Sequence, residues 1–162
     1  MSEPSDLPLL RGEIKNTTAV LERINAFYGD YQQRIAAQSP RATETAIVLA
    51  DILVSYYTCL ETLFLRISQY FENSLTPDKW HSDLLHKMTL EVPGVRRAVV
   101  SADTFAGLEE LLKFRHFKRY YFEFRYDWDR LDYLQKRFEQ VRPLLDRDLD
   151  QFNQFLQRLG GP

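Results

Sequence analysis

The residues best suited to chemistry lie in one stretch, FRHFKRYYFEFRYDW, at positions 114–128. Lysine and arginine supply five of the residues at 113–125, against a single glutamate, although the whole chain has a net charge of −2. Eight aromatic side chains share the stretch 114–128. Arginine binds phosphate oxygens two at a time, and aromatic rings stack on nucleic-acid bases. The stretch is therefore a candidate binding site for RNA phosphates.

The spacing of the cations supports the same interpretation. Arg115 and Arg119 are four residues apart, so on a helix they share a face and repel each other by about 0.2–0.5 kcal/mol. Lys118 and His116 occupy the same turns. Such crowding is easier to understand if an anion, or an acidic partner, lies between the charges.

A purely structural interpretation of this stretch is also open. In it, the arginines pair with carboxylates elsewhere in the chain. Four of the rings then belong to the core: Phe114, Phe117, Tyr121 and Phe124. The composition alone does not choose between the two interpretations.

Other kinds of site have no support in the sequence. There is no glycine-rich phosphate loop, His81 and His86 lack zinc spacing, and Cys59 is the single cysteine, so we expect no metal or cofactor. Cys59 cannot form an internal disulfide, which suits the cytoplasm. The most apolar run, at 46–54, is interrupted by Asp51 and is too short to span a membrane.

Helical periodicity predicts the elements that position the basic stretch. The expected helices cover about 10–37, 41–73, 80–88, 101–125 and 127–159. No alternating run predicts a strand. The sequence therefore predicts an all-α, up-and-down antiparallel bundle of four long helices and one short helix. We expect a flexible N-terminus at 1–9 and a single domain at 10–162.

Two helices carry further expectations. Pro143 lies inside the last helix and should kink it. The second helix is apolar on most sides, which places it in the middle of a bundle or at a subunit interface. Its surplus of apolar surface predicts a homodimer. On its smaller and more polar side we expect close helix packing: Asp51, Ser55, Thr58 and Thr62.

Three longer segments resemble one known family. They are YTCLETLFLRI (57–67), WHSDLLHKMTLEVPGVRRAVVS (80–101) and LEELLKFRHFKRYYFEFRYDWDRL (108–131). Together they make about 44–140 similar to the HepT-like branch of the HEPN superfamily, which are helical-bundle proteins of prokaryotic toxin–antitoxin systems. Enzymes of that superfamily are metal-independent endoribonucleases with an Arg-x4-6-His signature, often followed by x-Tyr.

The resemblance assigns roles to individual positions. The signature arginine, which holds the scissile phosphate, falls on Arg115, and the histidine position is Tyr120. The following tyrosine position is Phe122. A phenol with an ordinary pKa near 10 is a poor general base at neutral pH, and loss of the base costs a rate factor on the order of 10²–10⁴. His116 is an alternative source of the imidazole.

The resemblance leaves three functions open. The first is a ribonuclease that uses Arg115 with His116 or Tyr120. The second is a catalytically weak dimer that binds RNA or protein, with Lys118 and Arg119 in the basic cleft. The third is an interaction module whose basic patch docks an acidic partner.

The resemblance also implies partners. These are a second copy of the chain and a nucleotidyltransferase-type antitoxin. In similar toxins that partner modifies the tyrosine whose position here is Phe122, which lacks the hydroxyl, although Tyr120 and Tyr121 stand beside it. Glu61 matches the family's glutamate on the central helix. We expect Glu61 to pair with Arg115 or Arg119 and to orient it.

Overall fold

The computed structural model describes residues 6–37, 41–72 and 80–161, and these form five α-helices. The helices are α1 (Asp6–Arg34), α2 (Thr43–Phe71), α3 (Trp80–Met88), α4 (Ala102–Arg119) and α5 (Trp128–Leu159). No strand occurs in these ranges, in which Val92 and Arg96 form only an isolated bridge. The prediction of an all-α bundle with four long helices and one short helix is confirmed.

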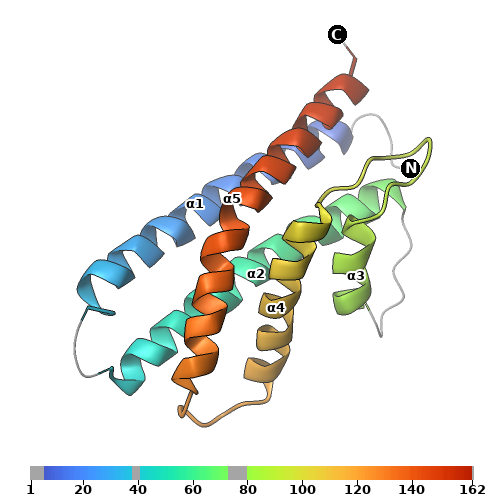
Figure 1. The fold of residues 1–162 in the computed structure, drawn as a ribbon. Coiled ribbons are helices and arrows are strands. Elements are labelled where there is room, and N and C mark those ends of the chain that lie inside the picture. Colours follow the sequence, from blue (N-terminus) through green and yellow to red (C-terminus); the bar gives the residue numbers. More distant parts are fainter. Residues whose placement is uncertain (1–5, 38–40, 73–79, 162) are drawn as a thin grey trace.

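Helix α2 lies at the centre of the bundle. Among the described elements it is the only helix that contacts all the others. In Figure 1, α1 runs beside the C-terminal half of α5, whereas the N-terminal half of α5 runs beside α4. The short α3 packs on α2 and α4.

Most large apolar side chains of α2 are buried within a single chain, and the others are half-buried. Its core-facing residues include Leu53, Tyr56, Leu60, Phe64 and Ile67, all at 0% exposure. The large apolar side chains that are exposed in the described residues all lie outside α2. The surplus of apolar surface on α2 that predicts a homodimer is therefore not found, and the homodimer itself stays a prediction.

Burial also explains why α2 is so apolar. By length and composition, it is the one helix of the described ranges that could cross a membrane. The central helix of a packed bundle meets the same two criteria. Since α2 is enclosed by four other helices, packing accounts for its composition.

The predicted close packing on the small polar side of α2 occurs at one residue, Thr58, which contacts Arg115 of α4. On the small polar side of α2, Asp51, Ser55 and Thr62 are exposed. A close approach also occurs between α4 and α5, where a Cβ added at Gly107 would lie 2.7 Å from Cγ2 of Val141. The absence of a side chain at Gly107 lets the backbone of α4 rest against α5.

Two helix boundaries differ from the predicted ones by more than three residues. Helix α1 begins at Asp6, inside the stretch 1–9, of which 1–5 lie outside the described residues. Helix α4 ends at Arg119 rather than near Arg125. Aromatic residues are weak helix formers, and Tyr121 instead forms hydrogen bonds with the backbone of Arg125.

The start of α4 is fixed to α5 by a buried carboxylate. Asp148 is 6% exposed, and its Oδ2 accepts hydrogen bonds from the Ser101 amide at 2.8 Å and from Thr104 Oγ1 at 2.5 Å. Ser101 Oγ in turn accepts from the Thr104 amide and caps the helix. This arrangement satisfies N–H groups that the first turn of a helix leaves unpaired.

A buried arginine fixes the connection between α3 and α4 to the end of α2. Arg96 is 3% exposed. Its Nε donates to Glu72 Oε1 at 2.7 Å, and its terminal nitrogens donate to the carbonyl oxygens of Leu90 and Lys87 at 2.8 and 3.0 Å. Such an arginine is buried at low cost because its charge is paired and its donors are satisfied.

Helix α5 changes direction between its two halves, as its orange and red parts show in Figure 1. Pro143 lies in the middle of this helix. Proline lacks the N–H that would bond to the preceding turn, and its ring crowds the carbonyl four residues earlier. The change of direction lets α5 follow α4 with one half and α1 with the other.

The contact at Gly107 leads to a stability prediction. Gly107→Ala should lower the free energy of unfolding by about 1–3 kcal/mol, because the new methyl group overlaps Val141. Urea unfolding followed by circular dichroism measures this loss. The matched control is Gly29→Ala in α1, where nothing lies within 4 Å and a gain of about 0.5–1 kcal/mol is expected. Equal gains in both variants would contradict the close packing of α4 on α5.

Candidate functional site

A cationic cavity lies where α4 crosses α2. Its volume is about 350 Å³, and it is lined by Val54 and Thr58 of α2 and by Arg115, Lys118 and Arg119 of α4. Residues three and four apart on a helix share one face, which is why α4 brings these three cations together. No lining residue is acidic. The cavity therefore suits an anion.

Arg115 is held in place by two residues of α2. Its Nε donates to Thr58 Oγ1 at 3.2 Å, and its Nη2 lies 3.4 Å from Glu61 Oε1. Glu61 is 4% exposed, and a carboxylate so deeply buried needs a cation beside it. The Nη1 atom of Arg115 is buried and has no hydrogen-bond partner in the described part of the chain. An acceptor that reached Nη1 would relieve the cost of leaving a donor unpaired.

A buried tyrosine completes the surroundings of this ion pair. The hydroxyl of Tyr57 is buried and has no hydrogen-bond partner among the described residues. Burial raises the pKa of Tyr57, the carboxylate of Glu61 raises it further, and Arg115 opposes the change. Tyr57 therefore stays protonated at neutral pH and cannot accept a proton there.

The other two cations keep most of their charge available. Lys118 Nζ lies 3.9 Å from Asp51 Oδ1, but the Asp51 side chain is 72% exposed, so this pair is weak. In the described ranges Arg119 has no carboxylate partner, and its guanidinium lies over the ring of Tyr120 at 5.6 Å. The interpretation in which carboxylates neutralise the arginines thus fits Arg115 and not Arg119.

The predicted site residues divide into two groups. Arg115, Lys118 and Arg119 line the cavity, and Glu61 pairs with Arg115 rather than with Arg119. His116 and Tyr120 are exposed and do not line it. Tyr120 follows the last residue of α4, so its side chain does not continue the helical face of Arg115. In the described structure, the cavity of one chain therefore has no imidazole or phenol in its lining.

The aromatic rings of the stretch 114–128 include both buried and exposed side chains. Phe114 is buried at 1% exposure and belongs to the core. Phe124 is 62% exposed, so its expected place in the core is wrong. Phe117 is 36% exposed, and Tyr121 stacks on it with ring centroids 4.8 Å apart. Sequence periodicity could not reveal this division because α4 ends before Phe124.

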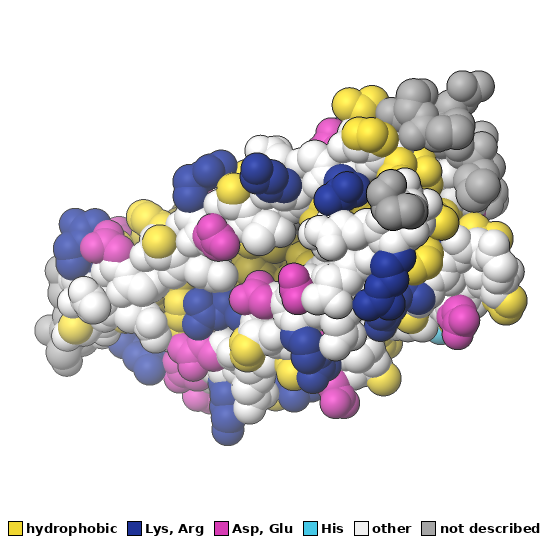
Figure 2. Space-filling model, turned by 90° about the horizontal axis from the view of Figure 1, so that it is seen from above, with side chains coloured by type: hydrophobic (Ala, Val, Ile, Leu, Met, Phe, Trp, Pro, Cys, Tyr) yellow, Lys and Arg dark blue, Asp and Glu magenta, His cyan; other side chains and the backbone are white. Residues whose placement is uncertain are grey.

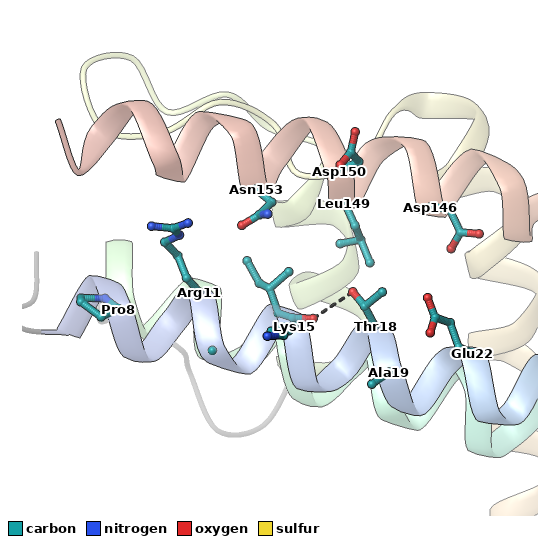
Figure 3. A pocket seen from close by; sticks show the side chains of 12 residues that line it. Pro8, Arg11, Lys15, Thr18, Ala19, Glu22, Asp146, Leu149, Asp150 and Asn153 are labelled. Carbon is teal, nitrogen blue, oxygen red and sulfur yellow. Dashed lines mark hydrogen bonds between the residues drawn. The ribbon is translucent and has the colours of Figure 1, made fainter. Parts of the chain in front are cut away.

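A larger cavity, of about 820 Å³, lies between α1 and α5, and Figure 3 shows its lining. Arg11 and Lys15 lie toward one end of it, and Glu22 and Asp146 face each other toward the other. Burial raises the pKa of Asp146, Arg142 lowers it, and Glu22 raises it. The face seen from above likewise mixes both signs of charge (Figure 2). This cavity has no net preference for an anion.

The ion pair between α2 and α4 leads to a prediction for a double-mutant cycle. Glu61→Gln and Arg115→Met should each lower the free energy of unfolding by about 1–3 kcal/mol, since each leaves a buried polar partner behind. The double variant should lose less than the sum of the two single losses. The exposed pair of Asp30 and Arg34 provides the control cycle, with a much smaller expected coupling because solvent screens the two charges. Strict additivity at Glu61 and Arg115 would show that the two side chains do not interact.

A comparison with protein families assigns the chain to a known group. A model for the HepT-like protein family matches residues 48–156. The match includes every residue that lines the cationic cavity. Comparisons with curated proteins and with solved structures gave no match. Because the family match covers about two thirds of the chain, the protein belongs to the HepT-like family of the HEPN superfamily.

Proposed function

We propose that this HepT-like protein binds RNA and that its cationic cavity holds a phosphate group of the RNA backbone. The observation that carries the proposal is the lining of the cavity, in which Arg115, Lys118 and Arg119 converge without an acidic residue. Guanidinium groups match phosphate oxygens in geometry as well as in charge. In the described part of the chain, Arg119 also lacks a carboxylate that a phosphate would have to displace.

The three cations have different tasks in this proposal. Thr58 and Glu61 fix the guanidinium of Arg115 before RNA arrives, so little conformational entropy is lost on binding. Lys118 and Arg119 contact the phosphates on either side. Their exposed charges supply most of the salt dependence.

The family membership supports a wider setting for this binding. We place the protein in the cytoplasm, in a toxin–antitoxin type system with a nucleotidyltransferase-type antitoxin as its partner. The chain acts as a homodimer in which two cavities share one cleft.

Metal-independent cleavage of the bound RNA is the second proposal, and the place of Arg115 in the lining of the cavity favours it. In this reaction the ribose 2′-oxygen attacks the phosphorus and gives its proton to a base. The 5′-oxygen of the next nucleotide leaves and takes up a proton, which yields a 2′,3′-cyclic phosphate. His116 or Tyr120 of a second copy is the source of the base, because neither lines the cavity of its own chain.

The binding proposal predicts a salt-dependent affinity for single-stranded RNA. Fluorescence anisotropy between about 50 and 200 mM salt should show weaker binding by Arg119→Ala, with a log–log salt slope smaller by about 0.7. Arg158→Ala is the matched control, because Arg158 is an exposed arginine at the far end of α5. An affinity that does not respond to salt, or equal effects of both variants, would contradict the proposal. Binding of an acidic protein but not of RNA would instead favour the interaction module.

The cleavage proposal is tested by incubating RNA with purified protein in EDTA. We expect slow cleavage by the wild type and none by Arg115→Ala, because the guanidinium no longer stabilises the phosphorane charge. If position 120 is that of the base, Tyr120→His should raise the rate by about 10²-fold. The same residual cleavage by wild type and Arg115→Ala would rule out a ribonuclease that uses this site.

A further inference from the structure

Three aromatic rings project from the loop that follows α4. Tyr120 is 72% exposed, Phe122 is 80% exposed and Phe124 is 62% exposed. Single exposed apolar side chains are common on protein surfaces, whereas three on one short loop mark a candidate contact site. The loop also carries the exposed Glu123 and Arg125 and directly follows Arg119.

The loop holds these rings in position through the residues between them. The hydroxyl of Tyr121 donates to the Arg125 carbonyl oxygen at 2.6 Å and accepts from the Arg125 amide at 3.1 Å. The ring of Tyr121 packs on Phe117 and Tyr126, with centroids 4.8 and 5.4 Å away. The guanidinium of Arg130 in turn lies 4.5 Å from the centroid of Phe117. The inward side of the loop is thus anchored while its outward rings face solvent.

We propose that Tyr120, Phe122 and Phe124 form a stacking platform for unpaired RNA bases. The inference rests on the proposed function, since the same RNA strand places its phosphates in the cationic cavity. Arg119 links the two parts because it lines the cavity and also lies over the ring of Tyr120. A strand that leaves the cavity past Arg119 meets the platform next.

The chemistry of the platform favours nucleic acid over protein. Its exposed apolar side chains are all aromatic, and base stacking needs a ring face rather than a shaped aliphatic pocket. Cations flank it at Arg119 and Arg125, which suits the phosphates that join successive bases. Bases in a duplex are stacked on each other and unavailable. The platform therefore gives the protein a preference for single strands.

The test compares two probes, a short single-stranded oligouridylate and inorganic polyphosphate, which carries phosphates without bases. The Phe122→Ala/Phe124→Ala double variant should bind oligouridylate at least about tenfold more weakly, because two stacking contacts are lost. Its affinity for polyphosphate should not change. Arg119→Ala should weaken both. Phe27→Ala in α1 removes a half-exposed ring elsewhere and should alter neither.

The outcomes separate this inference from the proposed function. If the double variant binds oligouridylate as the wild type does while Arg119→Ala weakens both probes, the platform is wrong and the phosphate site stands. If the wild type binds neither probe, both proposals fail. Light scattering on the double variant adds a third outcome. A mass half that of the wild type would identify the rings as a subunit interface and overturn the platform.

Discussion

The ion pair between Glu61 and Arg115 is the interaction on which the site depends. Glu61 lies on the central helix α2, where four other helices exclude most water from it. A carboxylate in such a place is costly unless a cation reaches it. Arg115 of α4 supplies that cation and is fixed by it. The contact that neutralises the buried carboxylate therefore also sets the position of the Arg115 guanidinium. Lys118 and Arg119 lie on the same face of α4 and line the same cavity.

Three contacts along α4 make this positioning rigid. Asp148 fixes its first turn to α5, Gly107 allows its middle to lie against Val141, and Arg115 anchors its last turns to α2. A side chain supported in this way loses little freedom when a ligand binds. The exposed loop that begins at Tyr120 starts from the end of this fixed helix.

Much of the fold is predictable from the sequence because apolar residues recur at helical spacing. The spacing of Arg115, Lys118 and Arg119 likewise predicts that they share a face. The end of α4 is not predictable in this way, since it depends on tertiary contacts of Tyr121 with Phe117 and with the backbone of Arg125. Whether Glu61 pairs with Arg115 or with Arg119 also depends on how α4 crosses α2. The helical periodicity of the sequence does not determine that crossing.

The most direct test of the account is the nuclear magnetic resonance of the arginine Nε–H groups during titration with a short single-stranded RNA. The account predicts that the signals of Arg115 and Arg119 shift together and saturate at one RNA concentration, while that of Arg158 stays in place. Shifts confined to Arg11 in the cavity between α1 and α5, or no shift at Arg115, would contradict the claim that α4 and α2 together form a phosphate site.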